Sequence, residues 1–262
     1  MITENNLTSS EQLSYHQDGY VVRENIFSKT EVIEINVALE RAVSKALLLS
    51  KIGDVYHLDG KRFVDLDYLT VQFEFKESTE TIKVIEPANQ LNRILDDLVR
   101  DIRIVNPIKK IIGSESVALW TNKLNLKSSK DGSGFGWHQD SPYWIHDCSH
   151  VDLLPNVYLA LDDANRQNGC FRLINQSHLK GCLPGIDNAT QLGGFYTNPD
   201  FFDLSDEVLM EVPAGSLVFF NPHIVHGSEP NKSDKPRRAF IMTYQPANNP
   251  MLKSGLIDNI EV

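Results

Sequence analysis

The order in which helical and strand patterns occur along the chain constrains its fold more than any single motif does. Apolar residues recur at helical spacing in two stretches, at residues 32–47 and 91–105. From Val117 onward, apolar residues instead alternate with polar ones or form short runs, as they do in strands. Helices followed by strands predict a β-sandwich or jelly roll that is braced by N-terminal helices.

Capping signals mark where the N-terminal helices begin. Residues 9–12 (Ser-Ser-Glu-Gln) and 28–31 (Ser-Lys-Thr-Glu) both have the spacing of a capping box, in which the first and last side chains bind free amides of the first turn. Ser9 and Ser28 are therefore the predicted N-caps. The second box precedes a long amphipathic stretch, so we expect a helix from there to about residue 51.

The stretch between the long helix and the strands is less regular. Segment 52–85 is charged and strand-like in places, and its pattern assigns no firm element. The next helical stretch contains Asn106-Pro107, which suit an N-cap and a first helical position. We therefore expect the helix to restart at Pro107 and to end at Gly113.

The second half of the chain is predicted to consist of strands joined by turns and one long loop. Asn168-Gly169 separates strands expected at 157–161 and 170–174, and Asn-Gly is a strong signal for a β-hairpin. The loop at 183–203 has a length that is usual for lids and binding loops. A further strand at 217–220 contributes to the predicted core.

Size and composition indicate how the chain is divided. It has 262 residues, of which 41% are hydrophobic, so it can bury a sizeable core. All-β chains of this length are routinely one domain. We expect a single domain over residues 1–262, with a helical part at about 1–113, a jelly-roll core at about 114–246 and a lid at about 183–203.

Charge and cysteine usage indicate the cellular setting. A formal net charge of −10 argues against a nucleic-acid-binding surface. No apolar run is long enough to span a bilayer, and the first residues carry no apolar signal core, so no membrane partner is expected. The 3 cysteines have unrelated spacings, which predicts reduced thiols in a cytoplasmic protein. Cys170 and Cys182 are weaker alternatives as metal ligands.

Trp137-His138-Gln139-Asp140 carries the first sign of chemistry. In an extended strand, residues two apart point to the same face, so His138 and Asp140 would project side by side into one cavity. An imidazole and a carboxylate are two-thirds of the facial triad that holds non-heme Fe(II). The pair alone is weak evidence, because a chain with 8 histidines can contain such a spacing by accident.

The other parts of such a site lie far downstream. His226 leaves a buried strand next to Gly227, which makes it the candidate third ligand. Arg237 follows at the head of the next strand, where its guanidinium can bind a carboxylate through two hydrogen bonds. Two histidines, an aspartate and an arginine together suit a metal that is chelated by a 2-oxo acid, with the arginine on the far carboxylate.

Neighbouring residues compete for these roles. His223 is an alternative third ligand, although the following Gly-Ser and the spacing to the arginine favour His226. Arg238 competes with Arg237, and because adjacent strand residues face opposite ways, only one of them can enter the pocket. Residues that could line a substrate site nearby are His146, His150, Trp137, Tyr143 and Trp144.

The order of these motifs resembles a known family. The motifs are His-Gln-Asp at 138–140, Asn-Gly at 168–169, Ser-His at 177–178 and His-Gly-Ser at 226–228, followed by an arginine. In this order they are similar to the phytanoyl-CoA dioxygenase family of Fe(II)/2-oxoglutarate-dependent oxygenases. Ectoine hydroxylase, another member, is similar around residues 125–140. The resemblance covers most of the chain and is weakest at 52–85 and 183–203.

The resemblance implies a fold and a set of site residues. The fold would be mainly β with N-terminal helices and a double-stranded β-helix, a jelly roll of the cupin type, as its core. By position, His138, Asp140 and His226 would be the iron ligands, and Arg237 would bind the C5 carboxylate of 2-oxoglutarate. The positions that line the co-substrate pocket in the family correspond to Asn125, Phe135, Tyr158 and Ser228, and Tyr158 stands where some members have tryptophan.

The resemblance also implies a reaction. Such an enzyme would couple the conversion of 2-oxoglutarate and O₂ to succinate and CO₂ with hydroxylation of an unactivated C–H bond, and ascorbate would support it. The carboxylate of Asp140 argues against halogenation, because related halogenases have Gly or Ala there. Desaturation, epimerisation or cyclisation by the same iron chemistry are alternatives, and so is a metal-binding jelly-roll protein without catalytic activity.

The substrate is expected to be a small metabolite, and the pathway a biosynthetic one that tailors natural products. A CoA ester is disfavoured because no basic cluster lies near the predicted lid. Asp147, Asp152 and Asp187 favour a cationic or polar substrate, unless they are only solvated surface residues. The sequence contains no signal for the oligomeric state.

Overall fold

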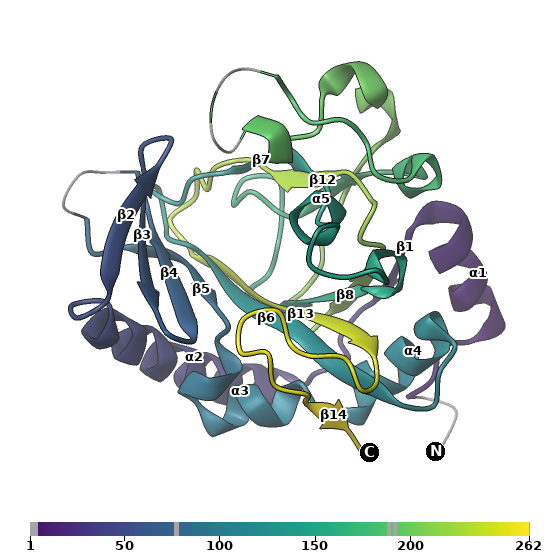
Figure 1. The fold of residues 1–262 in the computed structure, drawn as a ribbon, viewed down its shortest axis with the longest axis horizontal. Coiled ribbons are helices and arrows are strands. Elements are labelled where there is room, and N and C mark those ends of the chain that lie inside the picture. Colours follow the sequence, from purple (N-terminus) through teal and green to yellow (C-terminus); the bar gives the residue numbers. More distant parts are fainter. Residues whose placement is uncertain (1–4, 76–78, 188–189, 191–192, 262) are drawn as a thin grey trace.

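Two antiparallel sheets dominate the computed structural model of the protein, which describes residues 5–75, 79–187, 190 and 193–261. Within these residues a ten-stranded sheet lies beneath a four-stranded one, and helices cover the outer face of the larger sheet (Figure 1). The mainly β architecture with N-terminal helices that the order of patterns predicts is therefore confirmed.

Neighbouring strands in both sheets come from distant parts of the chain. The large sheet has the order β1-β11-β8-β13-β6-β5-β4-β3-β2, with β14 paired to β6, and the small sheet has the order β10-β9-β12-β7. The strands of the large sheet are β1 (Tyr20–Arg23), β2 (Asp54–Leu58), β3 (Lys61–Leu66), β4 (Leu69–Phe73), β5 (Ile82–Glu86), β6 (Val117–Lys127), β8 (Asn156–Ala160), β11 (Leu217–Phe220), β13 (Arg237–Pro246) and β14 (Asn259–Ile260). Those of the small sheet are β7 (Phe135–His138), β9 (Arg172–Ile174), β10 (Glu207–Leu209) and β12 (His226–Ser228).

The α-helices are short except for one. They are α1 (Ser9–Asp18), α2 (Lys29–Leu49), α3 (Arg93–Leu98), α4 (Ile102–Ile112) and α5 (Ser141–Trp144). The 3₁₀ turns are η1 (Asn89–Leu91), η2 (Val151–Leu153), η3 (Ser177–Lys180), η4 (Gly193–Phe195), η5 (Pro199–Phe201) and η6 (Leu204–Asp206).

The central strand β13 faces two hydrophobic cores. It pairs with β6 along one edge and with β8 along the other, so its backbone is held on both sides. Phe240 and Met242 belong to the core that also contains Leu39 of α2, whereas Ala239 and Ile241 belong to a second core on the opposite face. Alternate residues of one strand thus bury both faces of the large sheet.

Two capping boxes begin the N-terminal helices. Ser28 caps α2 with Glu31 at its third position, as predicted. The first box was placed one residue too late, because the N-cap of α1 is Thr8 and the reciprocal side chain is Glu11. The Glu11 carboxylate accepts a hydrogen bond of 2.7 Å from the backbone amide of Thr8, which the neutral amide of Gln12 does not replace.

Pro107 does not restart a helix, so that prediction was wrong. It lies inside α4, whose N-cap is Asp101, and the helical stretch is interrupted at residues 99–101 instead. Proline lacks an amide hydrogen, and at this position it removes one hydrogen bond to the preceding turn while α4 continues. Gly113 ends α4 in the left-handed conformation (φ 73°), as expected.

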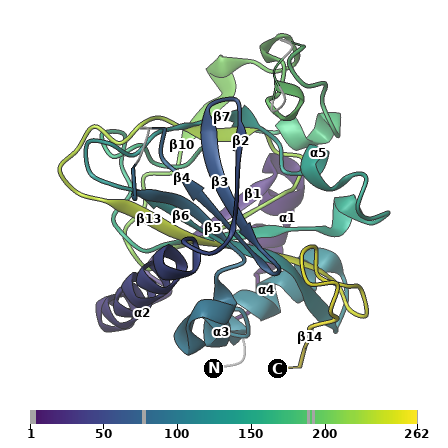
Figure 2. The ribbon, with the colours of Figure 1, turned by 60° about the vertical axis from the view of Figure 1, so that its left-hand side comes forward.

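Segment 52–85, which the sequence left unassigned, forms most of four strands. The antiparallel pairs β2–β3, β3–β4 and β4–β5 extend the large sheet beyond β6. The predicted helical part, residues 1–113, is therefore a mixture of helices and strands over its described residues, 5–75 and 79–113. Figure 2 shows this extension curling upward, and in Figure 1 it stands beside the small sheet.

Asn168-Gly169 forms a turn but not the predicted β-hairpin. Gly169 adopts φ 69°, as an Asn-Gly turn requires. The strands on either side belong to different sheets, because β8 pairs with β11 and β13 whereas β9 pairs with β10 and β12. Local turn chemistry was correctly recognised, but the partners of the flanking strands depend on contacts far away in the sequence.

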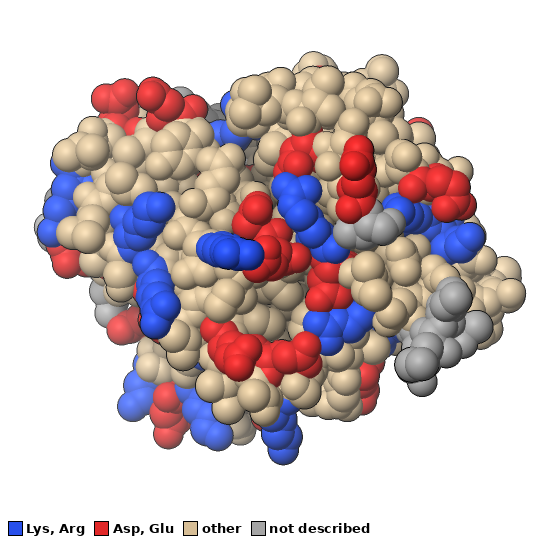
Figure 3. All heavy atoms as spheres, turned by 90° about the horizontal axis from the view of Figure 1, so that it is seen from below, with Lys and Arg blue, Asp and Glu red and all other residues tan. Residues whose placement is uncertain are grey.

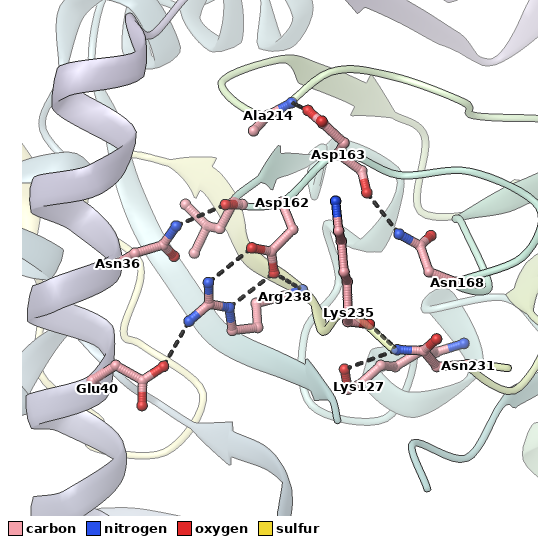
Figure 4. Close-up of polar contacts among 11 residues, drawn as sticks. Asn36, Glu40, Lys127, Asp162, Asp163, Asn168, Ala214, Asn231, Lys235 and Arg238 are labelled. Atoms are coloured by element: carbon pink, nitrogen blue, oxygen red, sulfur yellow. Dashed lines mark hydrogen bonds and ion pairs between the residues drawn. The ribbon is translucent and has the colours of Figure 1, made fainter. Parts of the chain in front are cut away.

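A polar network fastens α2 to the large sheet (Figure 4). Arg238 of β13 binds Asp162 through two hydrogen bonds of 2.8 Å and reaches Glu40 of α2 at 2.6 Å. Asn36, one turn earlier in α2, donates a 2.8 Å hydrogen bond to the carbonyl of Leu161. A guanidinium bound at two points holds a defined geometry, so this network sets how the helix lies on the sheet.

The surface that faces the chain ends carries charges of both signs. In Figure 3, Lys and Arg side chains are interspersed with Asp and Glu over this face. Among the described residues, no helix has the length and apolar character needed to cross a membrane.

Candidate metal centre

Strand pairing brings together two histidines from distant parts of the chain. His138 is the last residue of β7, His226 is the first residue of β12, and the two lie opposite each other in the antiparallel register. Their ring centroids are 4.2 Å apart. Cross-strand neighbours on one face are close enough for their side chains to touch, so the ladder itself positions this pair.

Backbone carbonyls orient both imidazole rings. Nδ1 of His138 lies 2.7 Å from the carbonyl oxygen of Gly136, and Nδ1 of His226 lies 3.0 Å from that of Ile224. A carbonyl oxygen can only accept, so each Nδ1 carries the proton and each Nε2 presents a lone pair. This is the arrangement by which metal-binding histidines are commonly held.

Asp140 reaches the histidines from a helix terminus and not from an extended strand. Strand β7 ends at His138, and Asp140 has α-helical dihedral angles (φ −79°, ψ −31°) at the start of α5. The amides of Asp140 and Ser141 both donate to the carbonyl of Pro222, at 3.1 and 3.0 Å. The expectation that alternation along a strand places this carboxylate was wrong, although the carboxylate does lie beside the imidazoles.

The three side chains have the spacing of a ligand set. His138, Asp140 and His226 each offer an atom, and these atoms all lie within 4.8 Å of one another. Oδ2 of Asp140 is buried and has no hydrogen-bond partner among the described residues, and it lies 3.8 Å from Nε2 of His226. A buried carboxylate oxygen without a donor is costly, so these residues fit a divalent cation.

Electrostatics keep the set in the protonation states that a metal requires. Burial, with a further contribution from His226, lowers the pKa of His138 to about 3, and burial lowers the pKa of His226. Burial opposes ionisation of Asp140, but the ammonium of Lys123, 3.4 Å away, holds the pKa of that carboxyl below its usual value. Neutral imidazoles and an ionised carboxylate are the forms that bind metal.

A cavity of about 800 Å³ opens over these residues. That volume lies within the range of roughly 300–1,000 Å³ that is usual for small-molecule sites. Both sheets line the cavity, and the large sheet does so partly through strands β3, β4 and β5 of its extension. All the metal and co-substrate residues expected from the sequence line it, namely His138, Asp140, His226, Arg237, Asn125, Phe135, Tyr158 and Ser228.

Arg237 lies at the inner end of the cavity, and Arg238 does not line it. Arg237 is 2% exposed, and its Nη1 donates to the hydroxyl of Tyr158 at 3.3 Å. Its Nε, like Oδ1 of Asn125, has no hydrogen-bond partner among the described residues. Arg238 is held on the far side of the strand by Asp162 and Glu40. The guanidinium at the inner end therefore suits an anionic ligand such as a carboxylate.

The loop predicted as a lid contributes to the wall of the cavity. Residues 188–189 and 191–192 of the 183–203 stretch lie outside the described residues. Tyr196 lines the cavity, and its hydroxyl accepts a 2.5 Å hydrogen bond from Lys61 of β3. Phe195 stacks on Tyr143 of α5 with ring centroids 4.3 Å apart. The lid thus meets both the sheet extension and α5 beside the metal centre.

The competing metal ligands, and most of the other candidates for the substrate site, do not line the cavity. His223 hydrogen-bonds Ser141 at 2.8 Å and Asp152 at 2.7 Å and is not part of the ligand set. His150 contacts Gln245 at 3.0 Å. Tyr143 and Trp144 line the cavity, but Trp137 packs against Phe202. The residues that were candidates and do not line it are His146, His150, His223, Trp137, Cys170 and Cys182.

Several charged residues of the cavity were missed by the sequence analysis. Lys123 lies two residues before Asn125 on β6, so strand alternation puts both on one face and was the signal that could have identified it. Glu86, Lys83 and Lys61 come from the sheet extension, whose placement the sequence did not give. Burial lowers the pKa of Lys83 to about 8, and its ammonium lies 4.2 Å from the ring centroid of Phe135.

Comparisons with known proteins agree with the resemblance that the order of motifs indicates. Residues 15–239 match the family described as Phytanoyl-CoA dioxygenase (PhyH). A probable alpha-ketoglutarate-dependent hypophosphite dioxygenase of Stutzerimonas stutzeri is 30% identical over 256 residues, which cover 94% of this chain and 82% of that protein. An ectoine dioxygenase of Bordetella bronchiseptica is 28% identical over 263 residues, which cover 93% of this chain and 77% of that protein.

One solved structure extends the comparison to the fold. EctD from S. alaskensis, in a structure with 2-oxoglutarate and 5-hydroxyectoine, is similar with a TM-score of 0.68 and 19% sequence identity, over 95% of this chain and 80% of that one. Together with the two facing antiparallel sheets, this likeness confirms the cupin-like jelly-roll core.

Proposed function

Because this chain belongs to the phytanoyl-CoA dioxygenase family, we propose that it is an Fe(II)- and 2-oxoglutarate-dependent oxygenase that hydroxylates an unactivated C–H bond of a small metabolite. The relatives that carry dioxygenase names support the reaction class. The shared cavity between the two sheets supports one oxygenase domain over residues 1–262.

The observation that carries this proposal is the convergence of ligand atoms with a buried guanidinium in one cavity. The three atoms of His138, Asp140 and His226 lie within 4.8 Å of one another. Arg237 lines the same cavity and keeps an unpartnered Nε among the described residues. A metal site alone has no need of a carboxylate clamp, so Arg237 favours a co-substrate that carries a second carboxylate.

Each residue has a role that follows from its contacts. His138, Asp140 and His226 would hold the metal, and their carbonyl partners keep the lone pairs in place. Arg237, aided by Ser228, would bind the distal carboxylate of 2-oxoglutarate. Tyr158 steadies the guanidinium through its hydroxyl. Bound Fe(II) and 2-oxoglutarate would supply the oxidising chemistry, in which O₂ is consumed and succinate and CO₂ are released.

Apolar side chains at the inner end would keep water from the reacting groups. Phe171 and Phe220 pack against the ring of His226, with centroids 5.3 and 5.2 Å away. Ile241 closes the floor of the cavity beside Tyr158. Excluding water strengthens the interactions of the charged groups and limits side reactions.

Succinate release tests the proposal. The protein is incubated with Fe(II), 2-oxoglutarate, O₂ and ascorbate, and succinate is measured without added substrate and with candidate metabolites. We expect His226→Ala and Arg237→Ala to reduce succinate release by at least about tenfold, because they remove a metal ligand and a charged hydrogen-bond donor.

Matched variants control for the loss of a histidine or an arginine in general. His57→Ala and Arg93→Ala remove exposed residues that do not line the cavity, and both should release succinate at the wild-type rate. If Arg237→Ala turned over at the wild-type rate with an unchanged requirement for 2-oxoglutarate, the assignment of this arginine would be wrong. If the wild type released no succinate under any condition, the oxygenase proposal itself would fail.

A further inference from the structure

Two residues of opposite charge stand next to the metal centre on neighbouring strands. Strands β5 and β6 are antiparallel, with Val84 opposite Asn125 and Ile85 opposite Leu124. Continuing this register by one residue puts Glu86 opposite Lys123. Both line the cavity beside Asp140. Residues that face each other in such a ladder have Cβ atoms roughly 5 Å apart, so the two charged groups share one part of the wall.

The position of Lys123 is set by the metal-binding aspartate. Its ammonium lies 3.4 Å from Oδ1 of Asp140. The other oxygen, Oδ2, is the one without a hydrogen-bond partner among the described residues. Its side chain is 21% exposed, and this exposure is toward the cavity that it lines. An ammonium has three donors, and one contact at 3.4 Å leaves it able to bind a ligand.

The position of Glu86 is set by a threonine on the neighbouring strand. Thr121, two residues before Lys123 on β6, donates a 2.8 Å hydrogen bond to Oε1 of Glu86. Among the described residues, no ion pair of 4.0 Å or less joins Glu86 to Lys123. The two charges are therefore held close together without neutralising each other through direct contact, and a ligand can contact both.

The balance of charge favours a ligand that carries both signs. A divalent cation and the 2-oxoglutarate dianion add no net charge to the cavity, and the charges of Asp140 and Arg237 also cancel. What faces a substrate beside the metal is then one ammonium and one carboxylate. A purely anionic ligand would meet the repulsion of Glu86, and a purely cationic one that of Lys123, at distances where charges interact strongly inside a protein.

The other charged residues that line the cavity are Lys61, Lys83, Lys253, Asp65 and Asp67. Lys83 is held by the hydroxyl of Ser133 and the carbonyl of Gly134, at 2.7 and 2.8 Å. Lys253 is paired with Asp65 at 3.2 Å, and Lys61 is bound to the hydroxyl of Tyr196. Apolar residues of the sheet extension, among them Phe63 and Phe75, make up much of the remaining surface. The cavity therefore suits a compact molecule with two charged groups at one end and an apolar body.

We propose that Lys123 and Glu86 select a small zwitterionic substrate, with its acid group on Lys123 and its ammonium group on Glu86. This inference rests on the proposed oxygenase function and names the substrate class of that site. The shared chemistry is an acid and an amine in one small molecule, which describes amino and imino carboxylic acids as well as aminoalkylphosphonic acids.

Stimulation of 2-oxoglutarate consumption by charge-matched probes tests the inference. The Fe(II)-loaded enzyme is assayed with amino and imino acids, with aminoalkylphosphonic acids, and with the N-acetyl and amide derivatives of the carboxylic acids. We expect at least one zwitterion to raise consumption by about tenfold or more, and its N-acetyl and amide forms to lose most of that stimulation. The two zwitterion arms distinguish a carboxylate from a phosphonate.

Variants of the two residues give a readout that a structural role would not move. Glu86→Gln should shift preference toward the N-acetyl derivative, which keeps only the acid, and Lys123→Met should shift it toward the amide, which keeps only the amine. We expect each ratio of stimulation, relative to the zwitterion, to change by about tenfold. Glu34→Gln and Lys51→Met, on the exposed surface of α2 and just beyond its end, should leave the ratios unchanged.

The outcomes separate this inference from the function on which it rests. If 2-oxoglutarate is consumed without substrate but every zwitterion fails to stimulate it, the substrate class is wrong and the oxygenase proposal stands. The same holds if the zwitterion, its N-acetyl form and its amide stimulate equally, or if the two variants leave all ratios unchanged. If no condition supports consumption of 2-oxoglutarate, the proposed function fails first.

Discussion

Adjacent arginines at the start of β13 show how much depends on the direction of one side chain. Arg237 enters the cavity, where its guanidinium donates a hydrogen bond to the hydroxyl of Tyr158. Arg238 leaves the opposite face and binds Asp162 and Glu40 (Figure 4). The alternation of side chains along a strand decides which guanidinium can bind a ligand and which one fastens a helix.

Substitution of Gly169 by alanine would show how tightly the turn after β8 is packed. Gly169 and Gly255 both have positive φ, at 69° and 67°, but a Cβ on Gly169 would lie 2.1 Å from the carbonyl oxygen of Glu229, whereas one on Gly255 would meet nothing within 4 Å. Gly255→Ala should cost about 1 kcal/mol for the backbone conformation alone. Gly169→Ala should cost roughly 2 kcal/mol more, because backbone must move.

Urea denaturation of both variants measures this difference. Each alanine carries the same conformational penalty, so the difference between the two unfolding free energies isolates the close approach at Gly169. Equal destabilisation of the two variants would show that the turn relaxes without strain and would contradict the prediction.

At the scale of single elements, the cap of α2 links helix formation to pH. Glu31 accepts hydrogen bonds from the amide and hydroxyl of Ser28 at 2.8 and 2.7 Å and from Arg103 at 2.8 Å. The bond from the Ser28 amide is the largest cause that lowers the pKa of Glu31 from 4.5 to about 2. The folded state therefore binds this proton less readily than the unfolded state does.

The sign of that shift predicts how a Glu31→Gln variant behaves in acid. The stabilisation from the charged carboxylate is fully present above pH 4.5 and is lost as the pH falls toward 2. Wild type should therefore melt at a higher temperature than Glu31→Gln at pH 7, and the gap should be much smaller at pH 2.5, close to the folded-state pKa. Thermal unfolding at both pH values measures the gap, with Glu34→Gln on the same helix as the control. A gap of the same size at both values would refute this role of the cap.

Local patterns predicted those elements whose stability is decided nearby. The period of the α2 residues, its Ser28 cap and the left-handed Gly113 were all recognised, because each depends on contacts within a few residues. The Asn168-Gly169 turn was recognised, but not the sheets that it joins. Pairing between distant strands rests on tertiary contacts, which no window of sequence contains.

The candidate site, too, could be predicted from the sequence only in part. His138, Asp140, His226 and Arg237 were identified from residue types and their order along the chain, and all four line one cavity. The geometry that positions Asp140 was not foreseen, because the end of β7 and the start of α5 depend on Pro222, which is distant in sequence. Glu86 was missed because the sheet extension alternates charged and apolar residues too irregularly to be assigned.

For the whole molecule, the cavity joins the two sheets. The small sheet supplies His138 and His226, whereas the large sheet supplies Arg237, Asn125 and Tyr158. A metal would contact mainly the small sheet and α5, and 2-oxoglutarate would span the space to the large one. Ligands that bind only the folded state add stability in proportion to their concentration, about 2.7 kcal/mol at one hundred times the dissociation constant.

Thermal unfolding with Fe(II) under nitrogen separates the stabilisation by the metal from the stabilisation by 2-oxoglutarate. We expect Fe(II) to raise the melting temperature of the wild type, and 2-oxoglutarate to raise it further only when Fe(II) is present. Arg237→Ala should keep the first increment and lose most of the second, and Asp140→Ala should lose both. If Arg237→Ala kept the full increment from 2-oxoglutarate, the two sheets would not be bridged through this arginine.

The ladder of β13 has a consequence for which changes the chain can tolerate. Sliding that strand past β6 and β8 by one residue would turn Arg238 toward the metal and carry the charge of Arg237 out toward α2. A one-residue deletion within β13 would therefore exchange the two arginines' surroundings and leave neither with its partners. The same deletion in the preceding loop, at residues 232–235, would shorten a connection and preserve every pairing partner of the strand.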